Sequence, residues 1–240
     1  MDKQVTQRLK SLDILRGFDL FMLVAFEPVL SSLLRTMKLP FGQSILYHFS
    51  HEQWVGFRAW DLVMPLFLFM SGVSMPFSFA KFQQMPDKSA VYKRIFKRVA
   101  LLWILGAVVQ GNLLALDLHT LRLYSNTLQA IAAGYLITAV IFLHIKSMKW
   151  QIVAAGVLLL IYWLPMTFLG DFTPEGNFAE KVDQLLLGRF RDGVRWADDG
   201  TWAFSPRYQY TWILSSITFG VTVLMGAIAG GVMKNGTDRY

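Results

Sequence analysis

The feature that most constrains this chain is a series of apolar blocks, each long enough to cross a lipid bilayer as one helix. A spanning helix needs about 20 mostly apolar residues, and hydrophobic residues make up 54% of the 240-residue sequence. Inside lipid, each backbone N–H and C=O group must be satisfied within the protein, which favours helices. The sequence therefore predicts an all-α fold, a polytopic transmembrane helix bundle that forms one membrane domain over residues 1–240. About six spans are expected, near residues 12–34, 59–79, 99–116, 127–145, 150–169 and 210–233.

Basic residues gather in the short connections after the second and fourth blocks. The first connection contains KFQQMPDKSAVYKRIFKR (residues 81–98), and the second contains Lys146 and Lys149. Short cytoplasmic loops carry an excess of Lys and Arg, so we expect a cytoplasmic N-terminus. The same rule explains the net charge of +7 without a nucleic-acid partner. The expected protein is integral and multi-pass, with membrane lipid as a partner.

Residues 170–209 form a long loop on the extracytoplasmic side of this predicted topology. Its segment NFAEKVDQLLLGRFRDGVRW (residues 177–196) has the pattern of an amphipathic helix at the outer surface. Aromatic residues follow, and they suit either an interfacial belt or a wall on which a sugar stacks. They are Trp196, Trp202, Phe204, Tyr208 and Tyr210.

Several familiar kinds of active site are excluded. The chain has no cysteine, which rules out disulfides, thiolate nucleophiles and cysteine metal sites. It has no G-x-S-x-G, Walker or G-x-G-x-x-G motif. His51-Glu52 begins like a zinc-protease motif, but Val55 stands where the second histidine belongs. A metal held by His48, His51 and Asp61 remains a minor alternative, and no metal is expected.

The first span carries ionisable side chains, which are costly in a bilayer and therefore need partners. They are Asp13, Arg16, Asp19 and Glu27. Asp13 and Asp19 each lie three residues from Arg16, so both can pair with it along one helical face. A charge cluster that snorkels to the cytoplasmic surface explains the first three equally well. Glu27 lies deeper and is harder to explain in that way.

Residues 48–78, HFSHEQWVGFRAWDLVMPLFLFMSGVSMPFS, begin polar and continue as a long apolar run. A helix wound from His51 would carry His51, Trp54, Arg58 and Asp61 on one side, followed by Pro65, Gly72 and Pro76. Small and kinking residues on that side indicate a face turned toward other protein. Taken alone, His51 is typical of an interfacial loop histidine.

Four blocks of the sequence occur in an order that is typical of one family. They are RLKSLDILRGFDLFMLV (residues 8–24), HEQWVGFRAWDLVMPLFLFMSGVSM (51–75), SNTLQAIAAGYL (125–136) and LSSITFGVTVLMGAIAG (214–230). They resemble the transmembrane acetyltransferases typified by heparan-α-glucosaminide N-acetyltransferase, including its bacterial relatives. The second block follows the family pattern H-x-x-W-x-G-x-x-x-x-D-L-V-x-P-x-F-x-F-x-x-G. Family members continue with further spans, so we expect the membrane domain to be incomplete at its C-terminal end. Glu27 stands where the animal enzymes have Asn.

The resemblance implies an acyl-CoA-dependent N-acetyltransferase. Its acetyl group would come from cytosolic acetyl-CoA and reach an amino sugar or glycan on the extracytoplasmic side, in this case of a bacterial inner membrane. The implied catalytic residue is His51, and imidazole is the side chain suited to act as a base near neutral pH. Whether His51 is a base or carries the acetyl group covalently stays open.

Other residues have two interpretations each. Asp61 is the second catalytic candidate, in which case it orients His51 or binds the amine; alternatively, it merely begins the helix. Contact between Asp61 and His51 requires a bend in the chain, because an unbroken helix would separate the two residues by about 15 Å. Trp54, Glu27, Asn126 and Gln129 are candidates for substrate binding, although Asn126 is an equally good helix cap. Arg16, with Asp13 and Asp19, is the candidate for the CoA end, together with the basic run 93–98.

Two competing hypotheses belong to other classes. One is a secondary transporter that uses the intramembrane carboxylates Asp19, Glu27 and Asp61, although no inverted repeat is visible. The other is an inactive fragment or membrane scaffold. Assembly into a homo-oligomer is left open.

Overall fold

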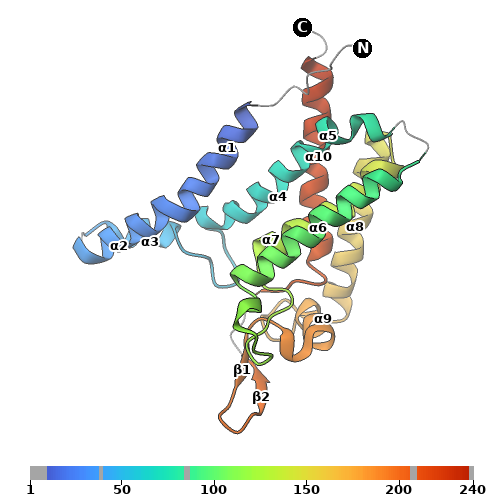
Figure 1. Cartoon of the computed structure of the whole chain (residues 1–240). Coiled ribbons are helices and arrows are strands. Elements are labelled where there is room, and N and C mark those ends of the chain that lie inside the picture. The colour runs from blue at the N-terminus through green and yellow to red at the C-terminus, as the bar shows by residue number, and fades with distance from the viewer. Residues whose placement is uncertain (1–9, 38–39, 84–86, 206–209, 238–240) are drawn as a thin grey trace.

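A computed structural model describes residues 10–37, 40–83, 87–205 and 210–237 of the chain. The predicted all-α bundle is confirmed, with a small hairpin as its only sheet within the described residues (Figure 1). The helices before the long loop are α1 (Lys10–Phe21), the π-helix η1 (Met22–Phe26), α2 (Glu27–Met37), α3 (Gly42–His48), the 3₁₀ turn η2 (Ala59–Leu62), α4 (Val63–Val73), α5 (Met75–Gln83), α6 (Ser89–Val109), the 3₁₀ turn η3 (Leu113–Ala115), α7 (Thr127–His144) and α8 (Met148–Phe168). The remaining elements are α9 (Phe178–Leu187), the 3₁₀ turn η4 (Gly188–Phe190), β1 (Val194–Trp196), β2 (Trp202–Phe204) and α10 (Ser216–Thr237).

Five helical segments in the described part of the chain are long and apolar enough to cross a membrane. They are Lys10–Met37, Ala59–Phe79, Thr127–His144, Met148–Phe168 and Ser216–Lys234. The second segment has the bounds that the sequence predicts. The bounds of the other four differ from the predicted ones by one to six residues, except that Thr127 begins its segment as predicted. Residues 210–215, expected in the last span, precede α10.

The third expected span is where structure and prediction differ. The helix there is α6, which begins at Ser89 and ends at Val109, not at residue 116. Its first half therefore includes the basic run 93–98, which the sequence had suggested as a loop. That charge sets α6 apart from the five apolar segments, although it is a helix of similar length.

Small residues let α10 approach its neighbours closely. A Cβ added to Gly72 would lie 1.9 Å from the Val223 carbonyl oxygen, and one added to Gly226 would lie 2.0 Å from that of Phe69. Gly230 is equally tight against Val73. Gly226 and Gly230, four residues apart, therefore mark a place where helices pack closely. The buried core forms where α4, α5, α6, α7 and α10 meet.

The two ends of the bundle differ in structure. The start of α1 and the end of α10 lie at one end, and α9 with the β1–β2 hairpin lies at the other (Figure 1). The helix expected over residues 177–196 is present only in its first half, as α9, and residues 194–196 form β1 instead. Its buried face includes Glu180 and Asp183, so it packs on protein through polar groups as well as apolar ones. The hairpin, in which Val194 pairs with Phe204, was not predicted.

Candidate functional site

The segment between α3 and η2 is an irregular loop that brings His51 back toward Asp61. The interpretation of one helix from His51 onward is therefore wrong, because helical structure begins only at Ala59. Gly56 explains the turn: its φ of +141° lies in a region that L side chains rarely adopt. A Cβ there would also lie 2.7 Å from Cγ of Glu52. This is the bend that contact between His51 and Asp61 requires.

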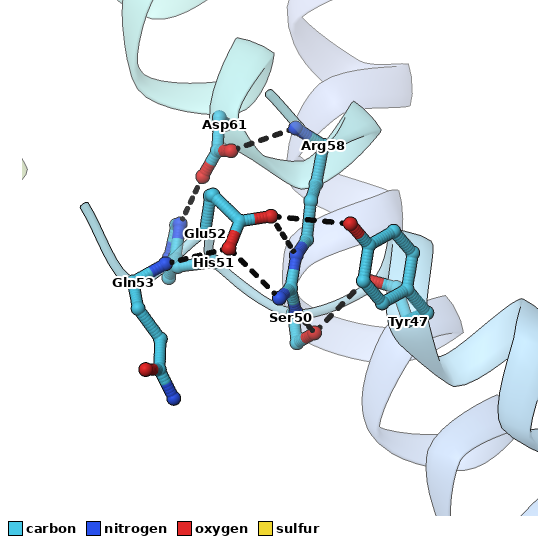
Figure 2. Close-up of polar contacts among 7 residues, drawn as sticks. All are labelled: Tyr47, Ser50, His51, Glu52, Gln53, Arg58 and Asp61. Carbon is cyan, nitrogen blue, oxygen red and sulfur yellow. Dashed lines mark hydrogen bonds and ion pairs between the residues drawn. The ribbon is translucent and has the colours of Figure 1, made fainter. Parts of the chain in front are cut away.

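His51 and Asp61 form a hydrogen-bonded pair. His51 Nδ1 lies 2.8 Å from Asp61 Oδ1, and the other carboxylate oxygen accepts the backbone N–H of Arg58 at 2.9 Å (Figure 2). Asp61 thus contacts His51 and also accepts a backbone N–H at the start of η2. Because an ionised carboxylate only accepts, the proton belongs on Nδ1, and Nε2 of the neutral ring keeps a lone pair. The His51 side chain is 51% exposed, which leaves Nε2 open to a reactant.

A second ion pair braces the same loop. Arg58 Nε donates to Glu52 Oε2 at 2.8 Å, and its Nη2 donates to Oε1 at 3.1 Å (Figure 2). Tyr47 donates its hydroxyl to Glu52, and the Arg58 guanidinium covers the Tyr47 ring at 4.0 Å. The hydrogen bonds from Arg58, followed by that from the Gln53 amide, lower the pKa of the Glu52 carboxyl to about 2. Glu52 therefore stays ionised, and the loop keeps its shape, across the neutral range.

The long loop reaches the His51 loop at two places. The Trp54 indole donates to the Phe172 carbonyl at 2.6 Å. The Tyr210 ring meets the His51 ring edge-on, with centroids 6.3 Å apart. Burial, then the negative charges of Asp61 and Asp192, raise the pKa of the Tyr210 hydroxyl, so it stays protonated at neutral pH. An aromatic wall thus stands beside His51.

Helix α9 fixes this wall in place. Asp183, which is fully buried, accepts the backbone N–H groups of Trp212 at 2.7 Å and of Ile213 at 2.8 Å. The Trp212 ring stacks on Tyr210, and its centroid also lies 5.2 Å from that of the Tyr124 ring. Glu180 on the same helix is paired with the buried Arg191. Helix α9 therefore holds Trp212, on which the Tyr210 ring stacks. Tyr208 lies outside the described residues.

Asn126 and Gln129 are not directed toward His51. Asn126 Oδ1 accepts the N–H groups of Leu128 and Gln129, which makes it the cap of α7. Its Nδ2 donates to the Gly106 carbonyl at 2.9 Å, and the Gln129 amide bonds to Ser125 N and to the Leu123 carbonyl. Both side chains are buried. Asn126 is therefore the N-cap of α7, as one of its two interpretations predicted.

The four ionisable residues of the first span lie in different environments. Arg16 lies 3.9 Å from Asp13, as expected, but its Nη2 donates to the Met70 carbonyl at 3.0 Å and forms no ion pair with Asp19. Asp19 is buried, and its Oδ2 has no partner among the described residues. Glu27 accepts the Ser31 hydroxyl at 2.7 Å. Arg16 and Glu27 thus bond to residues other than His51 and Asp61.

His48 lies at the end of α3 against the Tyr47 ring, apart from the His51–Asp61 pair. Within the ranges that the structure describes, no three His, Cys, Asp or Glu side chains are grouped so as to hold a metal ion.

Two features of the site were missed from the sequence. The Glu52–Arg58 pair lies six residues apart in an irregular loop, where no periodic pattern indicates contact. Tyr210 was named only as one of five aromatic residues that suit either an interfacial belt or a sugar-stacking wall. Its position beside His51 depends on packing between residues far apart in the sequence, which composition cannot reveal. The raised density of aromatic residues around 202–212 was the available signal.

Comparison with known proteins gives the site its family context. A search of the curated proteins found no match to the chain. Residues 8–176 match the family described as "Heparan-alpha-glucosaminide N-acetyltransferase, catalytic". This range covers more than half of the chain and includes the whole loop that carries His51, Glu52, Arg58 and Asp61. The chain therefore belongs to the heparan-alpha-glucosaminide N-acetyltransferase catalytic family.

Proposed function

We propose that this membrane N-acetyltransferase moves the acetyl group of acetyl-CoA onto the amine of an amino sugar or glycan, with His51 at the reacting centre. The observation that carries the proposal is the 2.8 Å contact between His51 Nδ1 and Asp61 on an open loop. A carboxylate on one ring nitrogen fixes the tautomer and leaves the other nitrogen available for chemistry.

In the direct route, His51 acts as a general base. The acceptor amine attacks the thioester carbonyl, a C–N bond forms and the C–S bond breaks. Nε2 takes the proton released by the amine, and CoA leaves as the thiolate, to which that proton can return. Asp61 stabilises the imidazolium that forms between these steps. A positioned base contributes typically about 10²–10⁴-fold to the rate.

In the covalent route, His51 Nε2 attacks the thioester carbonyl itself. The C–S bond breaks, CoA leaves as the thiolate, and an acetyl-imidazole forms. The amine then attacks this acetyl group, the Nε2–C bond breaks and the amide is released, while the proton that the amine loses goes to the CoA thiolate. The same His51–Asp61 geometry serves both routes.

The surroundings of His51 suit a sugar acceptor. Tyr210 stands edge-on to the imidazole with 46% of its surface exposed, and Trp54 is 37% exposed on the same loop. Aromatic rings offer flat apolar surface at low entropic cost, with a polar handle on tyrosine and tryptophan. We assign Tyr210 to the wall that orients the acceptor. Trp54 supports this wall through its bond to Phe172.

We assign the binding of acetyl-CoA, the acetyl donor, to the end of the bundle opposite His51. The basic first half of α6 and the Asp13–Arg16 pair lie toward the end of the bundle that the positive-inside rule places in the cytoplasm. CoA is polyanionic and requires cations. This arrangement supports supply of acetyl-CoA from the cytoplasm and acceptance on the other face. The three carboxylates of the transporter hypothesis, by contrast, each have a separate environment: Asp19 is buried, Glu27 binds Ser31, and Asp61 binds His51.

Reconstituted vesicles test the proposal. Protein is inserted into liposomes, labelled acetyl-CoA is placed on one side and glucosamine on the other, and labelled N-acetylglucosamine is measured by mass spectrometry. We expect product only when both substrates and the protein are present. Glucosamine uptake without acetyl-CoA, together with no acetylated product, would instead favour a transporter.

A further inference from the structure

A pocket that Arg58 lines has no assigned role. It has a volume of about 420 Å³ and is lined by Arg35, Gln43, Leu46, Tyr47, Ser50 and Arg58. Arg35 comes from the end of α2, the next three residues come from α3, and the last two come from the His51 loop. This volume falls within the range of small-ligand sites, about 300–1,000 Å³. Five of the six lining side chains are polar, and two are guanidinium groups.

The carboxylate nearest the pocket is already saturated with hydrogen bonds. Glu52 Oε1 accepts from Gln53 N at 3.0 Å and from Arg58 Nη2 at 3.1 Å. Its Oε2 accepts from Arg58 Nε at 2.8 Å and from the Tyr47 hydroxyl at 3.2 Å. The side chains of Arg58 and Glu52 are only 14% and 20% exposed, so this ion pair is a fixed part of the protein beside the pocket. Glu52 neutralises Arg58 and has no capacity left for a second guanidinium.

Arg35 is therefore a cation at the pocket without a counter-charge. Neither Arg35 nor Gln43 makes a hydrogen bond or ion pair with another residue in the part of the chain that the structure describes. Arg35 can present a planar fork of N–H donors, and Gln43 can add an amide donor. A concave site lined by unmatched positive charge concentrates anions from solution.

We propose that this pocket binds an anionic group, namely a phosphate, sulfate or carboxylate, with Arg35 as its principal ligand. Guanidinium pairs with such groups through short charge-assisted hydrogen bonds that are stronger than neutral ones. Two sources share this chemistry: an anionic substituent on the acceptor sugar, and the phosphate of a lipid headgroup. The acceptor source rests on the proposed transfer reaction, whereas anion binding itself does not.

Arg58 links the pocket to the His51–Asp61 pair. The side chain of Arg58 lines the pocket, and its backbone N–H is bound by Asp61 (Figure 2). Ser50 also lines the pocket and immediately precedes His51. An acceptor whose anionic group rests on Arg35 would thus be held next to the loop that presents His51.

Thermal unfolding in detergent tests binding without any need for turnover. The melting temperature is measured against increasing glucosamine 6-phosphate, with glucosamine as the uncharged-substituent control. In a parallel arm, phosphatidylglycerol is compared with phosphatidylcholine in mixed micelles. Each series is run on the wild type, Arg35→Gln and Arg35→Lys. Arg195→Gln is the matched control, because it removes one exposed guanidinium from the β1 strand.

We expect the phosphate-bearing sugar or the anionic lipid to raise the melting temperature of the wild type, while its neutral counterpart does not. Arg35→Gln should weaken the apparent affinity by about tenfold or more, Arg35→Lys should retain part of it, and Arg195→Gln should match the wild type. Stabilisation by the sugar phosphate identifies the acceptor source, and stabilisation by the lipid identifies the headgroup source. If neither anion stabilises the protein, or if Arg35→Gln and Arg195→Gln behave alike, the proposal is overturned. Because no acetyl transfer is measured, failure of the proposed enzyme activity would be seen separately.

Discussion

At the scale of single residues, Asp61 combines two tasks that the sequence presents as alternatives. One carboxylate oxygen lies on His51 Nδ1 and the other on the Arg58 backbone N–H. The carboxylate that orients the imidazole is therefore held by the start of a helix. A group fixed in this way loses little entropy when it positions its neighbour.

Asp61→Asn tests the orienting role. An amide can donate to Nδ1 and so favour the wrong tautomer, and we expect kcat to fall by about 10²-fold or more. KM for acetyl-CoA should change little, and Asp61→Glu should restore part of kcat. The measurement is steady-state acetylation with a pH profile. A kcat for Asp61→Asn within twofold of the wild type would remove Asp61 from the mechanism.

Tyr210 is expected to act on the acceptor alone. Tyr210→Ala should raise KM for the amino sugar by about three- to tenfold, because the ring's contact surface is lost. Tyr210→Phe keeps the ring and should resemble the wild type. Initial rates with each substrate varied in turn separate the two constants. An equal effect of Tyr210→Ala on KM for acetyl-CoA would contradict this assignment.

Glu52 makes the stability of the His51 loop depend on pH. Its pKa is lowered from 4.5 to about 2 by its bonds to Arg58 and to the Gln53 amide. The ionised form is therefore favoured by the fold. Its stabilising contribution is complete above pH 4.5 and is lost as the pH falls toward 2. The melting temperature of the wild type should fall more steeply over this window than that of Glu52→Gln. Parallel curves would show that the ion pair does not stabilise the fold.

At the scale of elements, the loop from residue 49 to residue 58 determines the site. Its shape depends on Gly56, whose positive φ and contact with Glu52 leave no room for a side chain. The sequence shows the spacing from His51 to Gly56 to Asp61, but a helical wheel cannot show that the chain folds back between them. This is why the helix expected from His51 was wrong although the span from Ala59 was right.

Gly56→Ala should distort this loop. Strained backbone of this kind costs about 1–3 kcal/mol, and displacement of Glu52 should move His51 away from Asp61. We expect a lower melting temperature and a large loss of kcat. The matched control is Gly156→Ala in α8, where nothing lies within 4 Å of the added Cβ and stability should be kept or improved. Equal activity of the two variants would mean that the turn at Gly56 is not required.

Helix α9 shows a different limit of sequence reasoning. Its periodicity predicts a helix, and the helix is present. However, its buried Asp183 binds backbone groups near residue 212, and no local pattern identifies a partner about thirty residues away. The role of α9 in holding Tyr210 beside His51 therefore emerges only from the folded chain.

At the scale of the whole molecule, the spans were the most predictable feature. A bilayer imposes length and apolarity on each crossing segment, so blocks such as 59–79 and 127–145 show their bounds directly. The four-residue spacing of Gly226 and Gly230 is likewise visible in the sequence and is typical of close helix packing. Helix α6 was less predictable, because the basic residues of its first half are typical of a cytoplasmic loop.

The sequence named His51 and Asp61 as candidate site residues, but it did not show the geometry of the site or the part that Glu52 and Tyr210 have in it. The resemblance identifies His51 and Asp61, and the structure supplies the contact between them. Asn126 and Gln129 match the family's third block, yet their side chains bond within the protein at the start of α7. Resemblance thus locates residues, whereas hydrogen-bond partners determine which side chains remain open to a substrate.

The most direct test of the account is acetyl transfer by His51→Ala beside His48→Ala, with equal amounts of folded protein in the same membranes. Labelled acetyl-CoA and glucosamine are supplied, and the initial rate of N-acetylglucosamine formation is measured. We predict that His51→Ala lowers the rate by at least about 10²-fold, while His48→Ala stays close to the wild type. A wild-type rate for His51→Ala would contradict the assignment of the reaction to this loop.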